Sequence, residues 1–216
     1  MTHDDDLAHQ PLPVAAGASG PVEVSAGPRT AVATDLALIG TFAALIAVGS
    51  LVAVAVSAVP VPITLQTFAV LLAGAVLGAR RGALAVLLYL TVGLAGLPIF
   101  AQGFGGPAVL GRPSVGYLLA FPIAAWLVGW AAERGVGRSW PRRTAILVAG
   151  AVAGSLAVYA VGVPVLAARA GMSLGEALVF NGIFVPFDAV KLVLAVLVAA
   201  SVHRAFPDLL PRRRPA

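Results

Sequence analysis

Two charged residues, Asp188 and Lys191, lie inside the segment 183–200, which otherwise has the apolar composition of a membrane-spanning helix. Either charge alone costs roughly 2.5–3.5 kcal/mol at the centre of a bilayer, so a chain that keeps both must pair them or use them. Being an i, i+3 pair, they lie on one face of a helix. A carboxylate that accepts hydrogen bonds, beside an ammonium that donates them, suits a small polar ligand. The pair predicts a ligand site in a transporter component, and the alternative is an ion pair that holds this helix against a neighbour.

The composition of the chain indicates the class of protein that carries this pair. Sixty per cent of the 216 residues are hydrophobic, 11% are charged, and the mean hydropathy is +0.98. An average soluble domain has roughly 25% charged residues, so this composition predicts a membrane protein without a soluble domain. Cysteine is absent, which excludes disulfides, thiolate metal sites and cysteine nucleophiles.

Six apolar segments predict an all-α integral membrane protein with six transmembrane helices in one domain, residues 33–204. Clusters of Pro, Gly or Arg separate the segments. The second and third are short for straight spanning helices, so we expect them to be tilted, kinked or partly re-entrant. The segments are 35–56, 65–77, 83–97, 115–132, 145–163 and 183–202.

The two ends of the chain differ from this domain. Residues 1–32 combine three consecutive Asp residues with repeated Pro and Gly and no apolar periodicity, which predicts a disordered tail. This tail lacks the basic start and apolar core of a signal peptide. Residues 205–216 are expected to form a second, basic tail.

The distribution of basic residues predicts the orientation in the membrane. If the N-terminus is inside, eleven of the 14 Lys and Arg residues fall on the cytoplasmic side, and only Arg112 and Arg169 fall outside. Such an excess in short loops predicts cytoplasmic N- and C-termini, in agreement with an even number of spans. The eleven are Arg29, Arg80, Arg81, Arg134, Arg138, Arg142, Arg143, Arg204, Arg212, Arg213 and Arg214.

Two outer loops, residues 59–68 and 93–117, are rich in Pro, Gly and aromatic residues rather than in charge. Proline fixes the backbone and glycine permits close approach, so such loops can form an ordered lid over a pocket that opens outward. The alternative is that they are only breaks between helices.

The motifs in these loops and in the adjoining segments are specific. They are Val61-Pro62-Ile63-Thr64-Leu65-Gln66-Thr67-Phe68, Leu77-Gly78-Ala79-Arg80-Arg81-Gly82, Leu88-Tyr89-Leu90, Gly96-Leu97-Pro98-Ile99-Phe100, Gly116-Tyr117 and Pro186-Phe187-Asp188-Ala189-Val190-Lys191. In this order they resemble the BioY family, the biotin-binding subunits or S components of energy-coupling factor (ECF) transporters. The resemblance covers residues 35–202. It implies six spans, ordered outer loops over a ligand pocket, and biotin uptake by capture at the outer face.

The resemblance also implies the residues of a biotin site, which are Asp188, Lys191, Tyr117, a loop position at Gln102 or Gly103, and Gln66 and Tyr89 in the motif runs. The cyclic urea of biotin has two N–H donors and a carbonyl acceptor, so Asp188 can accept from it and Lys191 can donate to it. Tyr117, Gln102, Arg112 and backbone N–H groups are available to the biotin carboxylate.

The chain departs from the family pattern at three places. It has Arg112-Pro113-Ser114-Val115 where many relatives have Gly-Pro-Thr before Gly-Tyr, and Phe187 where a glycine is common. Gly103 has no side chain where some relatives have Asn, and Gln102 is the substitute we expect.

The energy for transport must come from other proteins, because the chain has no phosphate-binding Gly-x-x-x-x-Gly-Lys-Ser/Thr loop. The resemblance implies an ECF T component and two ABC-type ATPase subunits as partners, in the plasma membrane of a prokaryote. Small residues four apart in the first helix, Ala43 and Ala47 among them and the pair Gly40 and Ala44, suit docking of the T component. Alternatively they let this helix pack within its own bundle. Neither a cofactor nor a metal nor a nucleic acid is expected.

Two other classes of protein are weaker interpretations. An ion-coupled secondary transporter of a small vitamin-like molecule would use Asp188 as its titrating group, but no second acidic residue or His lies deep in the predicted spans. An enzyme would need a nucleophile with a base or a metal cluster, and no His lies in any predicted span. Dependence of transport on ATP hydrolysis would exclude the carrier, and an unchanged ligand would exclude the enzyme.

Overall fold

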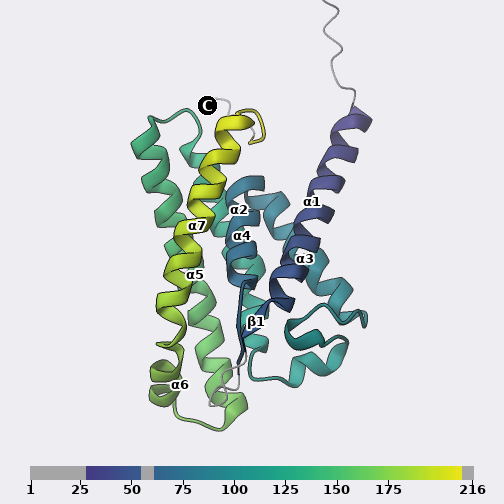
Figure 1. Cartoon of the computed structure of the whole chain (residues 1–216), viewed down its shortest axis with the longest axis vertical. Coiled ribbons are helices and arrows are strands. Elements are labelled where there is room, and N and C mark those ends of the chain that lie inside the picture. The colour runs from purple at the N-terminus through teal and green to yellow at the C-terminus, as the bar shows by residue number, and fades with distance from the viewer. Residues whose placement is uncertain (1–27, 55–60, 211–216) are drawn as a thin grey trace, which may run out of the picture.

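The computed structural model of the chain describes residues 28–54 and 61–210, which are almost entirely helical (Figure 1). The helices are α1 (Pro28–Leu51), α2 (Gln66–Leu77), α3 (Ala79–Leu94), α4 (Val115–Gly135), α5 (Trp140–Ala170), α6 (Leu174–Asn181) and α7 (Phe184–Ala205). Two short strands, β1 (Ala53–Val54) and β2 (Ile63–Thr64), pair antiparallel, and two 3-10 helices, η1 (Ala101–Gly103) and η2 (Pro107–Gly111), lie between α3 and α4. The predicted all-helical class is confirmed for the described residues apart from this strand pair.

Four of the described helices are long and apolar enough to cross a membrane: α1 from Val32 to Leu51, α4, α5 and α7. With 12 residues in α2 and 16 in α3, these two helices are shorter than the roughly 30 Å hydrocarbon core at 1.5 Å per residue. The second and third segments are therefore short, as the sequence predicts. The chain is a membrane protein with several apolar helices.

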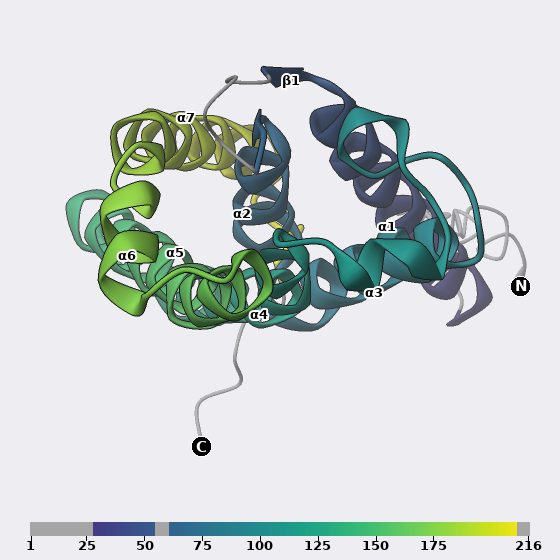
Figure 2. The same cartoon turned by 90° about the horizontal axis from the view of Figure 1, so that it is seen from below.

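The short helix α2 lies in the centre of the bundle, between α1 on one side and α5, α6 and α7 on the other (Figures 1 and 2). Ten of its 12 residues are buried, because its sequence is apolar on every face and it packs against α1, α3, α4 and α7. Glycines permit this packing. A Cβ added at Gly74 would collide with the backbone of Ala125 in α4, and one at Gly129 would collide with the backbone at Gly78.

The first helix ends earlier than the sequence predicts. The prediction extends the helix to residue 56, but α1 ends at Leu51 and Ala53–Val54 pairs with Ile63–Thr64 as a strand. Proline explains part of the difference, because Pro62 disfavours helical backbone at Val61 and favours an extended chain toward β2. At its other end α1 begins at Pro28, before the predicted start at Asp35.

The later helices are longer than predicted. Helix α3 begins at Ala79, directly after Gly78, so that Arg80 and Arg81 lie in its first turn. Helix α5 runs through Pro164 to Ala170, whereas the prediction ends it at 163. Proline is tolerated inside membrane helices because neighbouring helices can satisfy the freed carbonyl. Helix α6 was not predicted, although Ser173 and Glu176 form its capping box.

The end of α7 corrects two further expectations. The prediction that no His lies in a span is wrong, because α7 extends to Ala205 and buries His203 at 3% exposure, with Nε2 3.4 Å from the Val76 carbonyl. The predicted basic tail 205–216 is partly folded: Leu210 is buried, and Arg81 Nη2 donates to the Leu209 carbonyl at 2.5 Å. Residues 1–27 of the predicted disordered tail and residues 211–216 lie outside the described residues.

The two ends of the described chain lie at the same end of the bundle. Arg81 also pairs with Asp35 of α1 at 3.1 Å, so α1, α3 and the segment after α7 are connected at this end of the bundle. Figure 1 shows the start of α1, the end of α7 and the turn between α4 and α5 at the same end, with α6 and the 3-10 helices at the other.

Candidate functional site

A cavity lies among the helices toward the end of the bundle that carries α6 and the 3-10 helices. Its walls come from the segment 61–67, the loop 100–114, the first turns of α4, the middle of α5 and the first half of α7. Most of the wall is apolar, with Val61, Phe100, Leu118, Phe121 and Phe184 as its larger members. A mostly apolar cavity with a few polar groups is the usual form of a small-molecule site.

Asp188 and Lys191 lie in this cavity on the same face of α7, as their spacing predicts. Lys191 Nζ donates to Asp188 Oδ1 at 2.8 Å, and both residues are buried, with exposures of 6% and 7%. The pair is thus both an intrahelical ion pair and part of a cavity wall. The two interpretations from the sequence are compatible in this geometry, and neither excludes the other.

Tyr159 of α5 is the main residue that the sequence analysis missed. Its hydroxyl donates to Asp188 Oδ2 at 2.6 Å, so each oxygen of the carboxylate has one donor from the chain. Tyr159 also lines the cavity. The one signal in the sequence is a polar aromatic residue within a helix made mostly of small apolar residues.

Tyr117 lines the cavity as predicted and connects it to α6. Its hydroxyl donates to Asn181 Oδ1 at 3.1 Å, and Asn181 is buried at the last position of α6. The ring fits against α5 because position 162 is glycine, where any Cβ would collide with the ring of Tyr117. Phe184, at a ring distance of 6.4 Å, completes this corner of the cavity.

Gln66 and Tyr89 differ in their position relative to the cavity. Gln66 lines the cavity, whereas Tyr89 is buried at 1% exposure and is absent from the wall. Gln66 Nε2 donates to the Tyr89 hydroxyl at 2.9 Å, and that hydroxyl lies 3.4 Å from the Ile99 carbonyl. Ser50 Oγ of α1 donates to the same carbonyl. Tyr89 is therefore placed to position Gln66 and the start of the loop, rather than to contact a ligand.

Gln102 and Gly103 lie in the loop that covers the cavity but do not line it. Gln102 Oε1 accepts from Arg112 Nη2 at 2.9 Å, and Arg112 does line the cavity. The guanidinium of Arg112 also stacks on the Phe104 ring at 3.8 Å. Gln102 has a φ of +64°, which non-glycine residues rarely adopt, so the backbone here is held by its surroundings. The residue that the sequence suggested as a contact instead positions Arg112.

The two alanines suggested for partner docking face the bundle. Ala43 is buried and Ala47 is half-buried, and both pack with Ile46 in the core between α1, α2 and α3. This position fits the alternative interpretation, in which the small residues let α1 pack within its own bundle. Ala44 is exposed on the same helix, and the Cβ position of Gly40 is open. Docking of a partner on α1 stays a prediction.

The polar groups of the cavity are few and varied. Among the described residues, no group of three or more His, Asp or Glu could hold a metal ion. The cavity wall includes the Asp188 carboxylate, the Lys191 ammonium and two tyrosines. The guanidinium of Arg112 lines it from the loop before α4. The arrangement suits a small molecule with neighbouring donors and acceptors and, at another point, an anionic group.

The sequence of the chain matches the model of the BioY family over residues 16–208. The chain belongs to the BioY family. It is 40% identical over 183 residues to the biotin transporter BioY of Rhizobium etli, a match that covers 83% of this chain and 97% of that one. It is also 40% identical over 173 residues to the biotin transporter BioY of Thermotoga maritima, covering 76% and 93% of the two chains.

The fold is similar to a known crystal structure, that of the S-component for biotin from an ECF-type ABC transporter. The TM-score is 0.73 at 27% identity, and the match covers 83% of this chain and 95% of the other. The sequence-based assignment to the BioY family is therefore confirmed, and the S-component fold agrees with it.

Proposed function

We propose that this BioY-family chain is the biotin-binding S component of an ECF transporter and takes part in biotin uptake. The observation that carries the proposal is the cavity in which Asp188, Lys191 and Tyr159 converge, in a chain whose relatives are named biotin transporters. The chain is a transport protein and not an enzyme, since its relatives are named as transporters and its structural neighbour is an S-component.

The urea ring of biotin fits the polar pair. A carboxylate has about four acceptor positions, and Lys191 and Tyr159 use two of those of Asp188, so an N–H group of the urea has room to donate. An ammonium has about three donors, and Lys191 uses one on Asp188. The urea carbonyl can accept another. The apolar walls then contact the fused ring and the pentanoate chain.

The carboxylate of biotin is assigned to Arg112. A guanidinium binds a carboxylate by two parallel hydrogen bonds, and Arg112 is held in place by Gln102 and by the Phe104 ring. Asp188 and Arg112 both line the cavity, one from α7 and one from the loop before α4. Biotin would therefore lie with its ring toward α7 and its carboxylate toward the loop.

We further infer six membrane crossings, in which the short helices α2 and α3 complete a domain of residues 33–204 with the four longer ones. The burial of α2 on all sides supports this, because a short helix surrounded by protein need not match the bilayer thickness. The excess of Arg at the end shared by α1, α7 and the α4–α5 turn supports cytoplasmic termini in the plasma membrane of a prokaryote. The loop over the cavity is then an outer loop.

The partners proposed are a T component and two ABC-type ATPase subunits. On α1 the half-buried Gly40, whose Cβ position is open, and the exposed Ala44 offer a face for close helix packing, in addition to the predicted Ala43 and Ala47. The alternative, an ion-coupled carrier, needs Asp188 to take up a proton. In this structure Asp188 accepts hydrogen bonds from Lys191 at 2.8 Å and from Tyr159 at 2.6 Å, an arrangement that suits ligand binding.

The direct test is to identify the ligand that co-purifies with the full chain in detergent by mass spectrometry, and to titrate the ligand-free protein with biotin. Saturable binding of biotin at one site, without chemical change, is the expected result. Retention of another small molecule in preference to biotin would reject the substrate but leave the family assignment intact.

A further inference from the structure

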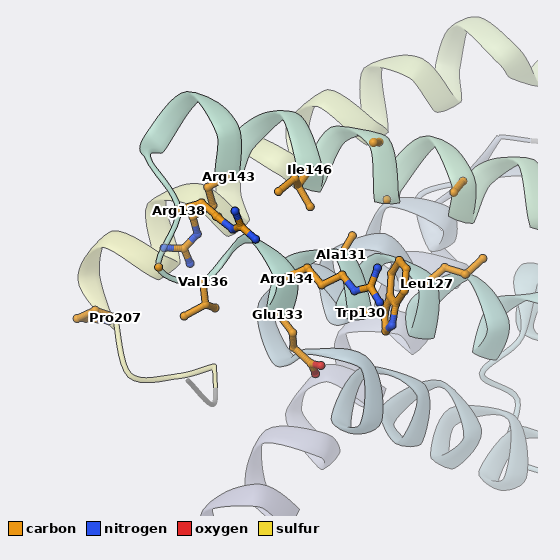
Figure 3. Close-up of a pocket in the computed structure, with 14 residues that line it drawn as sticks. Leu127, Trp130, Ala131, Glu133, Arg134, Val136, Arg138, Arg143, Ile146 and Pro207 are labelled. Carbon is orange, nitrogen blue, oxygen red and sulfur yellow. The ribbon is translucent and has the colours of Figure 1, made fainter. Parts of the chain in front are cut away.

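A second cavity, open on the side of the bundle, lies between α4 and α5 beside the turn that joins them (Figure 3). None of the residues that line it lines the proposed biotin cavity. One end of it is basic, with Arg138 and Arg143, whereas Arg134 extends along α4 over Trp130. The remainder of its wall includes Leu127, Ile146 and small residues of α5. A basic end that continues into an apolar groove suits a ligand that has both an anionic group and an apolar chain.

The basic end has a surplus of positive charge. Three guanidinium groups line the cavity together with one carboxylate, that of Glu133. Glu133 Oε1 accepts from the backbone N–H of Ala79 at 2.8 Å, so this carboxylate is engaged by the start of α3. Arg81 pairs with Asp35 and Lys191 with Asp188, and neither ion pair involves an arginine of this cavity. Arg138 and Arg143 are thus available to an anion.

The groove beside the arginines is shaped by small residues. Ile146, Ala149 and Ala153 follow one another at helical spacing on one face of α5, and Leu127 and Ala131 do so on α4. The floor is closed where Gly150 of α5 meets Ala131 of α4, since a Cβ at position 150 would collide with that alanine. Ala149 and Ala153 are exposed, so the trough between the two helices opens toward the surroundings of the bundle.

The tryptophans mark the level of the membrane surface at this cavity. Of the three tryptophans of the chain, Trp130 lies in the last two turns of α4 and Trp140 at the first residue of α5, on either side of the basic turn, while Trp126 lies one turn before Trp130. Arg134 stacks on Trp130 at 3.3 Å, and Arg204 stacks on Trp140 at 4.2 Å. Tryptophan is enriched at the headgroup level of membranes. The arginines therefore lie at the level of lipid phosphates, and the groove runs toward the hydrocarbon.

We propose that this cavity binds one anionic phospholipid. Its phosphate lies between Arg138 and Arg143, and one acyl chain follows the trough along Ala149 and Ala153. Basic pockets between membrane helices on the cytoplasmic side are known to suit anionic headgroups. A soluble phosphate would use the arginines but leave the apolar groove without a function, and a zwitterionic lipid would leave the surplus charge uncompensated.

The test compares lipids on the delipidated full chain in detergent, by native mass spectrometry and by competition with a fluorescent phosphatidylglycerol. The parent protein is expected to retain phosphatidylglycerol in preference to phosphatidylcholine with the same acyl chains. The double variant Arg138→Gln/Arg143→Gln should bind phosphatidylglycerol about thirtyfold more weakly, at about tenfold for every 1.4 kcal/mol lost. The matched control Arg142→Gln/Arg169→Gln, which removes the same charge outside the cavity, should bind as the parent does.

The groove is tested separately with Ala149→Phe, which fills the trough, against Ala145→Phe on an exposed position outside it. Only Ala149→Phe should lose the lipid. Equal retention of both lipids by the parent protein, or an unaffected Arg138→Gln/Arg143→Gln variant, would overturn the proposal. If glycerol 3-phosphate competed as effectively as the lipid does, the cavity would be a site for free phosphates rather than for a lipid. Biotin binding, measured on every variant, shows that each is folded and should not change.

Discussion

Tyr159 donates a hydrogen bond of 2.6 Å to Asp188 Oδ2, the carboxylate oxygen that Lys191 does not use. Two helices thereby meet at one carboxylate, since Tyr159 belongs to α5 and the ion pair to α7. The hydrogen bonds orient the carboxylate within the wall of the cavity. A ligand that donates to Asp188 therefore meets an acceptor already held in place, which lowers the conformational cost of binding.

The first prediction concerns Tyr159→Phe, which removes this hydrogen bond and keeps the ring. Hydrogen bonds to charged groups contribute about 1.5–3 kcal/mol, so biotin affinity measured by calorimetry should fall by about 1–3 kcal/mol. Tyr89→Phe is the matched control, because Tyr89 lies behind the cavity wall and should affect affinity less. Equal affinity of Tyr159→Phe and the parent would remove Tyr159 from the site.

The second prediction concerns the two charges themselves. Asp188→Asn and Lys191→Met each leave a buried partner without its counter-charge, so each should weaken biotin binding by about 1–3 kcal/mol or more. If the pair is a ligand site, both variants should still fold in detergent, as measured by thermal unfolding of the purified protein. Variants that unfold, or that bind biotin normally, would instead favour a purely structural ion pair.

The sequence predicts part of this site well and part of it poorly, for physical reasons. Asp188 and Lys191 were predictable because charge is costly inside an apolar segment and helical spacing fixes their common face. Tyr159 was not, because its contact with Asp188 depends on how α5 packs against α7, and no local pattern encodes that. Tyr89 and Gln102 lie in or beside recognisable motifs, yet both support neighbours of the cavity rather than lining it. A sequence motif indicates which region of the chain lies near a site, but it does not indicate in which direction each side chain points.

The same distinction applies to the fold. Long apolar segments gave the helices α4 and α7 to within a few residues, because hydrophobicity alone determines them. The end of α1 and the continuation of α5 through Pro164 depended on neighbours: a strand partner at Ile63–Thr64 in one case, and surrounding helices in the other. Helix α6 is short and mostly apolar, and its one local signal in the sequence is the capping box of Ser173 with Glu176.

The third prediction separates the two ends of biotin. Arg112→Gln should weaken binding of biotin but hardly change binding of biotin methyl ester, because the ester has no negative charge for the guanidinium to bind. Arg169→Gln is the control, since Arg169 is the other basic residue of the predicted outer loops and does not line the cavity. Gln102→Ala should have a smaller effect in the same direction, through loss of the 2.9 Å hydrogen bond that positions Arg112. Equal losses for acid and ester would place the carboxylate elsewhere.

The fourth prediction tests the orientation in the membrane. Single cysteines can be introduced into this cysteine-free chain at Ser139, in the α4–α5 turn, and at Gly175 of α6, both of which are exposed. With cytoplasmic termini, an impermeant thiol reagent added to intact cells should label Gly175→Cys and not Ser139→Cys. After the cells are opened, both should be labelled. The reverse pattern in intact cells would contradict the proposed outer cavity.

The last prediction concerns the coupling of transport to energy. Reconstituted alone in liposomes, the protein should bind biotin without accumulating it, because a ligand that equilibrates between two sides has no net driving force. Addition of a T component and two ATPase subunits should give concentrative uptake that requires hydrolysable ATP. Large residues at Gly40, whose Cβ position is open, or at the exposed Ala44 of α1 should reduce this uptake more than they reduce biotin binding. The predicted pair Ala43 and Ala47 provides the comparison, because substitutions there disturb the core and should lower thermal stability as well. Accumulation of biotin by the chain alone, driven by a proton or sodium gradient, would instead establish the ion-coupled carrier.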